Sequence, residues 1–316
     1  MIKASKLSVS LGAGQAVRDV SLLVRPGDRI GVVGESGCGK TMLGLAMIGM
    51  TPAAAKVSGS LRLDNAEMVG ADEKSWQVQR ARRVAMVFQE PMAALNPIKR
   101  VGDTVMEPLI IHMGLSRAQA RECALSLFEE VGIPDPEARF RQFPHEISGG
   151  QRQRVLIALA LTCDPGLLIA DEPTTALDAN VALRITELLA RLARDRTMAL
   201  LFISHDLAAV ARSTEDMLVM YGGDIVERGK TAAVLSDPRH PYTQGLLSAR
   251  PRPENVRETD GRRKRLPTIP GAVPPLADLP AGCRFAGRCP VEMSQCATVR
   301  PAEREGTICH QLEAAT

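Results

Sequence analysis

RIGVVGESGCGKT, residues 29–41, decides the fold class of this chain. Residues 29–33 form an apolar, strand-like run, and a helix is expected from Met42, so the G-x-x-x-x-G-K-T pattern between them has the context of a phosphate-binding loop, or P-loop. Glycines let successive backbone N–H groups turn toward phosphate oxygens, and a helix N-terminus adds partial positive charge. The flanking strand and helix disfavour the alternative, a chance glycine-rich turn. The predicted phosphate-binding residues are Gly34, Glu35, Ser36, Gly37, Cys38, Gly39, Lys40 and Thr41.

Three further apolar runs resemble the one before the P-loop, at residues 84–88, 167–170 and 199–203. Their apolarity is continuous rather than alternating, which is typical of strands buried on both faces of a parallel sheet with helices on each side. The chain is therefore predicted to be an α/β protein. Ligands of such sheets bind beyond the carboxyl ends of the strands, so one shared site is expected there. The polar residues that follow the three runs are Gln89, Glu90, Asp171, Glu172, Ser204, His205 and Asp206.

Chemical roles follow if a nucleoside triphosphate occupies the P-loop. Lys40 can bridge the β- and γ-phosphates, and the Thr41 hydroxyl can ligate Mg²⁺. Asp171 would help to hold Mg²⁺ through a water molecule, and Glu172 would be the general base that polarises the attacking water. The alternative for the two acids is a helix cap or a solvated pair before a turn, but a P-loop in the same chain favours the catalytic interpretation.

His205 and Gln89 end two other predicted strands. The imidazole of His205 could donate a hydrogen bond to the γ-phosphate and sense its loss. The Gln89 amide could contact Mg²⁺ or the attacking water. The alternatives are an ordinary loop histidine and an ordinary polar residue at a strand end.

Ser148, Gly149, Gly150 and Gln151 begin a predicted helix that continues to residue 161. A serine and two glycines at a helix start make a second phosphate-grasping helix N-terminus. One nucleotide does not need two such clamps from one subunit, so we expect a dimer in which this helix covers the γ-phosphate bound by the partner. Helical spacing over residues 116–131 indicates, together with this helix, a helical insertion at about residues 91–163.

Composition excludes several classes of protein. Apolar residues make up 45% of the 316 residues, which is enough for a core. The net charge of +3 argues against a general nucleic-acid binder, and 3% aromatic residues disfavour a base-stacking platform. No apolar run approaches the ~18 residues that cross a bilayer, and the N-terminus lacks a secretory apolar region, so a cytosolic product is expected.

The motifs in their order resemble those of an ABC-transporter ATPase subunit over essentially the whole chain. The resemblance implies a RecA-like core with a helical subdomain, and a head-to-tail dimer holding two ATP molecules. It implies that Ser148 and Gly150 act in trans, that Asp178 communicates between the sites, and that Gln89 faces membrane subunits. Ile147 replaces the usual leucine before the serine, and residues 11–17 lack the aromatic residue that often stacks on adenine, which leaves the adenine contact open. The matching segments are the P-loop, Gln89, Ser148-Gly149-Gly150-Gln151, Asp171-Glu172, Ala176-Leu177-Asp178 and His205.

The C-terminal part resembles the extension of one ABC subgroup, which energises import of di- and oligopeptides, with nickel and related solutes in neighbouring branches. Residues 250–280 are rich in proline and charge and are predicted to be a linker or an irregular segment. We expect residues 1–240 to form the ATPase domain and residues 241–316 the extension. The segments that carry this resemblance are His240-Pro241-Tyr242-Thr243, Ile269-Pro270-Gly271 and residues 282–290.

Four of the seven cysteines lie in the extension, at Cys283, Cys289, Cys296 and Cys309. Four thiolates suit Zn²⁺ or a [4Fe–4S] cluster. Zinc sites usually present ligands as close pairs, which this spacing lacks, and the resemblance also points to iron–sulfur. We therefore favour a cluster with a structural role, with zinc as the alternative and inert thiols as the third possibility. The other cysteines are expected to be packing residues.

The leading hypothesis is a peripheral ATPase on the cytoplasmic face of the membrane that drives a peptide importer. Its expected partners are a second ATPase subunit, identical or homologous, two transmembrane permeases and an extracytoplasmic solute-binding protein. Three alternatives remain: an importer of nickel or another small solute, a soluble ABC ATPase working on DNA or ribosomes, and a metal-regulated sensor. Near-neutral charge and a single P-loop disfavour the nucleic-acid class, so no nucleic-acid partner is expected.

Overall fold

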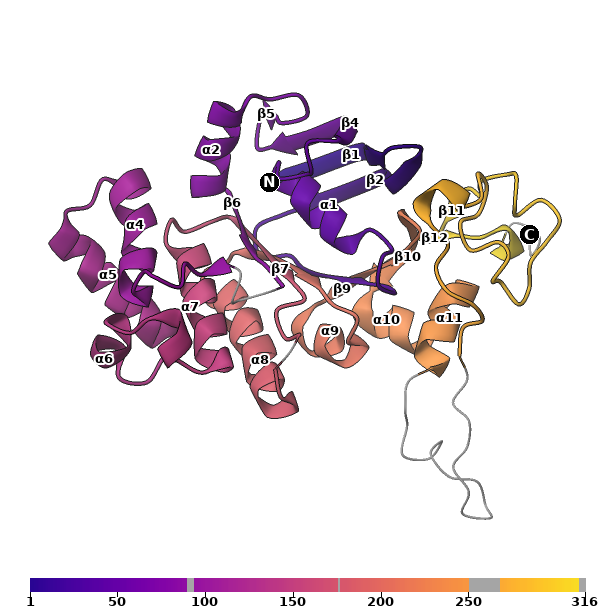
Figure 1. Ribbon diagram of the computed structural model, residues 1–316. Helices are drawn as coiled ribbons and strands as arrows, with labels where there is room; N and C mark the ends of the chain where they lie inside the picture. The colour runs from indigo at the N-terminus through magenta and orange to yellow at the C-terminus, as the bar shows by residue number, and fades with distance from the viewer. Residues whose placement is uncertain (90–93, 176, 250–267, 313–316) are drawn as a thin grey trace, which may run out of the picture.

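Two β-sheets with helices packed around them form the described part of this computed structural model, residues 1–89, 94–175, 177–249 and 268–312 (Figure 1). Glu90, Ala176 and most of the predicted linker lie outside these residues. Among the described residues, no helix has the length and apolarity needed to cross a membrane.

The larger sheet has eight strands in the order β11-β12-β10-β9-β3-β8-β7-β6. Strands β6, β7, β8, β3 and β9 run parallel, with Ile30 opposite Leu201 and Ile169 also opposite Leu201. All five residues of β7 and of β8 are buried. The predicted α/β class and parallel sheet are therefore confirmed. The strands are β3 (Arg29–Val33), β6 (Val84–Val87), β7 (Leu167–Asp171), β8 (Ala199–Ile203), β9 (Asp216–Tyr221), β10 (Asp224–Lys230), β11 (Glu303–Arg304) and β12 (Thr307–Ile308).

A second, antiparallel sheet has the order β2-β1-β4-β5 and was not anticipated from the apolar runs. Its strands alternate buried and exposed residues only in part, because the β1–β2 pairing contains several register shifts. This sheet covers α1 (Lys40–Met47), since Leu7 and Leu61 share one buried core with Leu43 and Met47. The strands are β1 (Ile2–Leu11), β2 (Gly14–Val24), β4 (Ala55–Leu63) and β5 (Ala66–Glu67).

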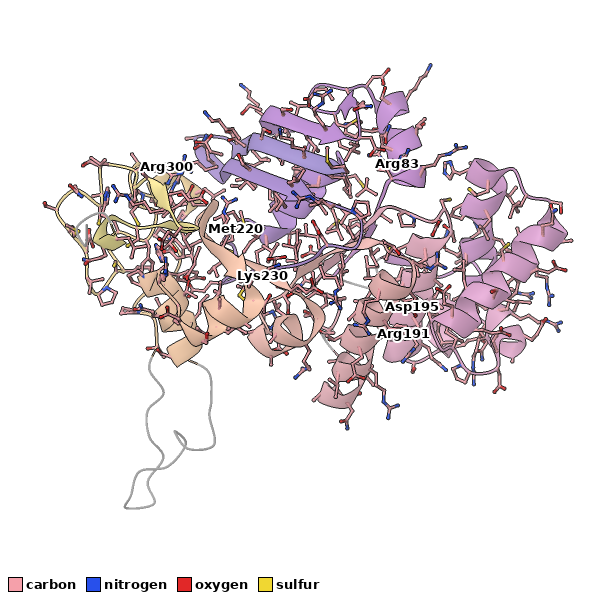
Figure 2. All side chains as sticks on the ribbon, turned by 180° about the vertical axis from the view of Figure 1, so that it is seen from behind. Arg83, Arg191, Asp195, Met220, Lys230 and Arg300 are labelled. Carbon is pink, nitrogen blue, oxygen red and sulfur yellow. The ribbon has the colours of Figure 1, made fainter. Side chains whose placement is uncertain are left out.

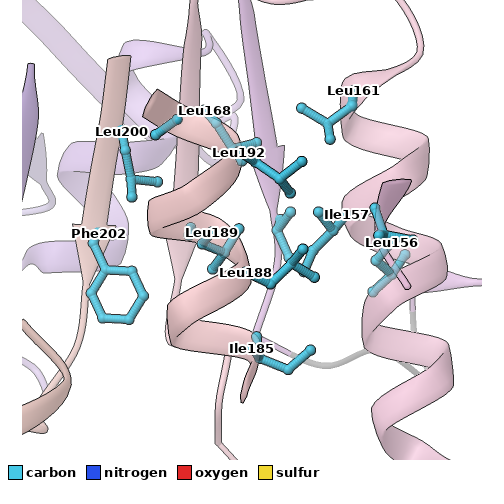
Figure 3. Close-up of a cluster of buried hydrophobic side chains, with 14 of the residues drawn as sticks. Leu156, Ile157, Leu161, Leu168, Ile185, Leu188, Leu189, Leu192, Leu200 and Phe202 are labelled. Atoms are coloured by element: carbon cyan, nitrogen blue, oxygen red, sulfur yellow. The ribbon is translucent and has the colours of Figure 1, made fainter. Parts of the chain in front are cut away.

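Helices α4 to α7 lie together beside the edge of the sheet formed by β6 (Figure 1). The predicted helix at residues 116–131 is α5, where Ser116 and Gln119 form a capping box, and the helix start at Ser148 is capped in the same way. Figure 3 shows how Ile157 of α7 and Leu188 of α8 meet over the sheet strands β7 and β8. Besides α1, the helices are α2 (Glu73–Arg82), α4 (Val101–Met113), α5 (Arg117–Glu130), α6 (Pro136–Phe140), α7 (Gly149–Leu161), α8 (Ala179–Asp195), α9 (Leu207–Ser213), α10 (Thr231–Ser236) and α11 (Pro241–Ser248). The 3₁₀ turns are η1 (Pro144–Glu146), η3 (Leu276–Asp278) and η4 (His310–Leu312).

The C-terminal segment is joined to the α/β core by aromatic packing and by sheet pairing. The ring of Tyr221 on β9 lies 4.7 Å from that of Tyr242 on α11 and 5.1 Å from that of Phe285 in the extension. Thr307 of β12 pairs with Glu227 of β10, which adds the extension to the edge of the large sheet. Phe285 belongs to the same buried core cluster as Tyr221 and Tyr242, so this C-terminal segment shares the core of the rest of the chain.

Buried charges reinforce this junction. The Nε atom of Arg18, on β2, donates to Asp224 Oδ1 at 2.8 Å, and Asp224 also accepts from Arg300 at 3.0 Å. Figure 2 shows Arg300 on the extension, beside the β-sheets. Two further donors of Arg18 reach the backbone carbonyls of Ala281 and Gly282, at 2.8 and 2.9 Å. Because buried ionic groups need partners, Arg18 and Asp224 together hold the start of the cysteine-rich segment against β2 and β10.

Candidate nucleotide site

The carboxyl ends of β3, β6, β7 and β8 meet at one cavity of about 640 Å³, as the shared-site prediction requires. A volume of this size is typical of small-molecule sites. P-loop residues line one part of the cavity, and three strand-end residues line the next. The lining residues are Leu11, Ala16, Ser36, Gly37, Gly39, Lys40, Thr41, Met42, Gln89, Glu172, His205 and Leu276.

The P-loop has the curled backbone that phosphate binding requires. Gly39 has a φ of +104°, and a Cβ atom there would lie 2.1 Å from the Ala16 carbonyl oxygen, so only glycine fits. The Lys40 ammonium group is buried and donates to the carbonyl oxygens of Gly34 and Glu35, both at 2.9 Å. Helix α1 begins at Lys40, earlier than the expected Met42, and its N-terminus therefore points at the loop.

Asp171 ends β7 and lies against the helix that follows the P-loop. Its Oδ1 atom accepts a hydrogen bond of 3.2 Å from the Thr41 hydroxyl. Burial raises the pKa of Asp171, and the hydrogen bond from Thr41 opposes this shift. A divalent cation here would favour the ionised carboxylate, so an oxygen pair from Thr41 and Asp171 fits Mg²⁺.

Glu172 is held by side chains from three different strand ends. Its Oε2 atom lies 2.9 Å from Thr175 Oγ1, 3.2 Å from His205 Nδ1 and 3.5 Å from Gln89 Nε2. Its backbone has a φ of +45°, in the left-handed region, and its N–H donates to the Ile203 carbonyl at 2.9 Å. A non-glycine residue in this region is strained, and such strain is found where a side chain must be aimed at a reaction. The arrangement places the Glu172 carboxylate in the cavity lined by residues of the P-loop (34–41), which we call the phosphate cradle.

Ser148, Gly149, Gly150 and Gln151 do not belong to this cavity in the described chain. Ser148 is exposed at the start of α7, where its hydroxyl accepts from the Gln151 N–H and the Gln151 side chain accepts from the Ser148 N–H. A Cβ atom on Gly150 would lie 2.8 Å from Val181 of α8, so the glycine allows the two helices to approach closely.

Asp178 occupies the start of the neighbouring helix α8. Its Oδ1 atom accepts from the backbone N–H groups of Asn180 and Val181, at 3.1 and 3.0 Å. The side chain therefore acts as a helix cap in this chain. The α7 and α8 starts are adjacent, since a Cβ atom on Gly149 would lie 3.6 Å from Leu177.

Sequence reasoning missed three residues that hold the P-loop from the C-terminal side. The Glu35 N–H donates to the Tyr242 hydroxyl at 2.7 Å. The Glu35 carboxylate forms an ion pair with the buried Arg288, whose Nη1 atom lies 2.8 Å from Glu35 Oε2. Leu276 lines the cavity itself. The family resemblance of the segments containing Tyr242 and Arg288 gave the only signal, because these partners lie more than 200 residues from the P-loop.

Of the three cysteines predicted to be packing residues, Cys38 is buried and Cys163 is partly buried, but Cys123 is exposed on α5, so the prediction is wrong for Cys123. Cys38 is buried in the P-loop, with its Sγ atom 3.9 Å from Lys40 Nζ, and acts as a packing residue. Burial raises the pKa of Cys283 to about 12; a backbone hydrogen bond at Phe285 opposes this shift, and the three other thiols of the extension add to it. The Cys283 N–H donates to the Cys296 carbonyl oxygen at 2.7 Å, so these two cysteines are adjacent. Among the described residues, no group of three or more His, Cys, Asp or Glu side chains is arranged to hold a metal ion.

Comparison with known proteins places the chain in a family. A family model described as "ABC transporter" matches residues 17–175, which contain the P-loop, Ser148 and Glu172. A putative peptide import ATP-binding protein of Brucella melitensis is 45% identical over 295 residues, covering 90% of this chain and 87% of that protein. This chain belongs to the ABC transporter family. It is an ATPase of the ABC type, and ATP is the nucleotide of its site.

A second family model, "Oligopeptide/dipeptide transporter, C-terminal region", matches residues 226–296 of this ABC protein. The dipeptide transport ATP-binding protein DppD of Escherichia coli is 41% identical over 307 residues, covering 96% of this chain and 92% of that protein. Among solved structures, the dimeric ATP-binding cassette MJ0796 in a post-hydrolysis state with ADP and Pi matches with a TM-score of 0.64 at 26% identity, covering 73% of this chain and 99% of that chain. The ABC ATPase fold and the peptide-transporter subgroup are thus both shown.

The Arg288–Glu35 pair yields a prediction for ATP binding. Replacing Arg288 with alanine leaves the Glu35 carboxylate without its cation beside the phosphate cradle. We expect the Kd for ATP, measured by calorimetry, to rise about tenfold because this carboxylate then repels the triphosphate. Exposed Arg117 on α5 supplies the control variant Arg117→Ala, which should bind ATP as the wild type does.

The double variant Glu35→Gln with Arg288→Ala separates charge from structure. It removes both members of the pair, so most of the lost affinity should return. Wild-type affinity in Arg288→Ala alone would show that the pair has no influence on the phosphate cradle.

Proposed function

We propose that this chain is the ATP-hydrolysing subunit that powers an ABC importer of di- and oligopeptides. The observation that carries the proposal is the joint presence of the Glu172-centred site and a C-terminal extension of the oligopeptide/dipeptide type. Relatives with matching length are named for dipeptide transport and, putatively, for peptide import. The ATPase domain would span residues 1–240, with a helical subdomain at about residues 91–163, and the extension residues 241–316.

Hydrolysis would begin with ATP bound through its phosphates to the P-loop backbone and Lys40. Residues Thr41, Asp171 and Gln89 would hold Mg²⁺, which neutralises phosphate charge. Glu172 then accepts a proton from the water whose oxygen attacks the γ-phosphorus, and the bond to the β–γ bridging oxygen breaks to give ADP and phosphate. His205, hydrogen-bonded to Glu172, would orient this carboxylate and donate to the γ-phosphate.

A second subunit would complete each site. Ser148 is exposed and its helix start lies outside the cavity formed by its own chain, so this helix start can face a nucleotide on another chain. We propose that Ser148, Gly149, Gly150 and Gln151 cover the γ-phosphate bound by the partner. The dimeric MJ0796 cassette with ADP and Pi supports such an assembly. Asp178, which caps the adjacent α8, would then link the two sites by moving with α7.

A groove between the ATPase core and α4 would receive the membrane permeases. Its volume is about 390 Å³, and its walls include Met50, Phe88 and Pro108. The side chains of Met50 and Phe88 are 47% and 36% exposed, and Ile111 of the neighbouring helix is 66% exposed. Apolar patches of this kind mark protein interfaces. Phe88 directly precedes Gln89, whose Nε2 atom lies 3.5 Å from Glu172 Oε2, so a permease helix in this groove would contact the segment that leads to the nucleotide site.

The complete system would place this protein at the cytoplasmic face of the membrane as a peripheral subunit. Two permeases would span the bilayer, and an extracytoplasmic binding protein would deliver the peptide. The second ATPase subunit would be a copy of this chain or a homologue. ATP binding would close the pair and draw the two permease-contacting grooves together, and hydrolysis would reopen it.

The extension thiols would hold a [4Fe–4S] cluster, with Zn²⁺ as the alternative. Cys296 and Cys309 are buried and Cys283 and Cys289 are partly buried, and a metal group would keep such thiols ionised, because thiolates need neighbouring positive charge. Arg284 and Arg288, both largely buried, would offset the cluster's negative charge. Its role would be to stabilise the fold of the extension.

The role of Glu172 is tested in the transporter reconstituted with its permeases and binding protein. Because Glu172→Gln removes the general base, peptide-stimulated ATP hydrolysis should fall ~10²–10⁴-fold. ATP-dependent dimers should persist, and the exposed α8 variant Glu187→Gln should hydrolyse ATP normally. Undiminished hydrolysis by Glu172→Gln would exclude this residue as the base.

The permease groove is tested by Met50→Asp. A charge buried in an apolar interface should weaken permease association by ~2 kcal/mol, or about thirtyfold, and reduce co-purification of the permeases accordingly. ATP binding by the isolated subunit should be unaffected. The control Val291→Asp changes a side chain with the same 47% exposure in the extension. Equal recovery of permeases with both variants would place the docking site elsewhere.

The metal group is tested on anaerobically purified protein by iron and zinc analysis and visible spectroscopy. A cluster predicts about four iron atoms per chain and visible absorption. Cys289→Ser should lower the iron content and Tm, whereas Cys123→Ser, an exposed site on α5, should change neither. One zinc ion per chain without iron would establish the zinc alternative, and metal-free wild-type protein would contradict both.

A further inference from the structure

The nucleotide cavity continues beyond the phosphate-binding residues to the turn between β1 and β2. Leu11, at the end of β1, and Ala16, on β2, line this end together with Leu276 of the C-terminal extension. The Ala16 carbonyl lies directly behind Gly39 of the P-loop, as the 2.1 Å approach of a Cβ atom there shows. A nucleotide whose phosphates lie on the P-loop therefore has an aliphatic surface within reach of its nucleoside part.

Leu276 is positioned by close packing against the β1–β2 turn. A Cβ atom on Gly14 would lie 2.5 Å from the Leu276 Cβ and 2.9 Å from its carbonyl oxygen. Gly14 is buried, so this contact is part of the folded core. The side chain of Leu276 itself stays only partly buried, which leaves apolar surface open to the cavity.

The chain on both sides of Leu276 is anchored to the ATPase core. Arg288 donates to the carbonyl oxygens of Pro270 and Gly271, at 2.7 and 3.2 Å, while its Nη1 atom binds Glu35 in the P-loop. On the other side, Arg18 of β2 holds the carbonyl of Ala281. These two arginines fix the segment that carries Leu276 relative to the phosphate cradle.

The base must be held without stacking on a phenylalanine, tyrosine or tryptophan ring of the described lining, because none of these three residue types is among the lining residues, and the one imidazole, of His205, lies beside Glu172 at the phosphate end. A purine ring still has two apolar faces, and burying them against aliphatic carbon is favourable. We propose that Leu276 is a nucleotide-binding residue that, with Leu11 and Ala16, packs against the adenine base of ATP. The C-terminal extension then completes the ATP site of its own chain. This inference rests on the proposed function only in taking ATP as the ligand.

The test compares ATP with inorganic tripolyphosphate, which has the phosphates but no base. Calorimetric Kd values for both ligands are measured with Mg²⁺ on the full chain. Leu276→Ala should raise the Kd for ATP about three- to tenfold, because it removes apolar contact with the base, and leave the Kd for tripolyphosphate unchanged. Leu276→Met, which keeps the apolar volume, should bind ATP nearly as the wild type does. Val291→Ala, elsewhere in the extension, is the matched control.

Gly14→Ala provides a second route to the same answer. Its new methyl group displaces Leu276 without altering the leucine, so it should also weaken ATP selectively over tripolyphosphate. Unchanged ATP affinity in Leu276→Ala, or an equal loss for both ligands, would overturn the inference. If Leu276→Ala fails to fold by circular dichroism, the outcome for Gly14→Ala decides. Failure of wild-type protein to bind ATP would instead contradict the proposed function.

Discussion

The buried ammonium group of Lys40 is the feature on which the rest of the site depends. Its two hydrogen bonds, to the carbonyl oxygens of Gly34 and Glu35, hold the P-loop curled around a space where phosphates fit. Strand β3 and helix α1 fix the two ends of this loop, and the antiparallel sheet covers α1 from outside. The end of β7, which carries Asp171 and Glu172, can then face the same space. This is because β7 lies next to β8, and β8 lies next to β3. Triphosphate binding needs this prior arrangement, since charge is stabilised most by groups that do not have to reorganise.

The cavity that would bind ATP and the helix start that would cover a partner's nucleotide are separate parts of one chain, since none of residues 148–151 lines the cavity. Glu172 has its hydrogen-bond partners within the chain, so the carboxylate is aimed before any second subunit arrives. Ser148, in contrast, satisfies only its own helix start and is exposed. This separation gives a physical reason for coupling hydrolysis to movement. If ATP is cleaved only when two chains are in contact, then permeases bound to those chains move together when the chains associate and apart when they separate. The C-terminal extension contacts Glu35 of the P-loop, so it would influence nucleotide binding rather than the surface that meets a second chain.

Much of the fold could be predicted from the sequence because its signals are local. Continuous apolar runs marked β3, β6, β7 and β8, and the serine at position 148 marked a capped helix start. The antiparallel sheet escaped prediction, since its bulged strands do not alternate cleanly. The Arg288–Glu35 pair and the Leu276–Gly14 contact escaped for another reason. They join residues about 250 positions apart, and no local pattern marks which arginine or leucine of the extension will reach the core. For Asp178, a local pattern explains only the helix cap that the structure shows. A role in communication between sites involves a second chain, which a single chain does not contain.

The central claim is that a nucleotide bound by one chain is sealed by the helix start of another. A structure of the ATP-loaded Glu172→Gln protein tests it most directly, because that variant keeps the triphosphate intact. The account predicts two chains facing head to tail, with the Ser148 hydroxyl of each within hydrogen-bonding distance of the γ-phosphate held by the other. A loaded complex in which Ser148 faces open solvent and no second chain lies across from the phosphates would contradict it.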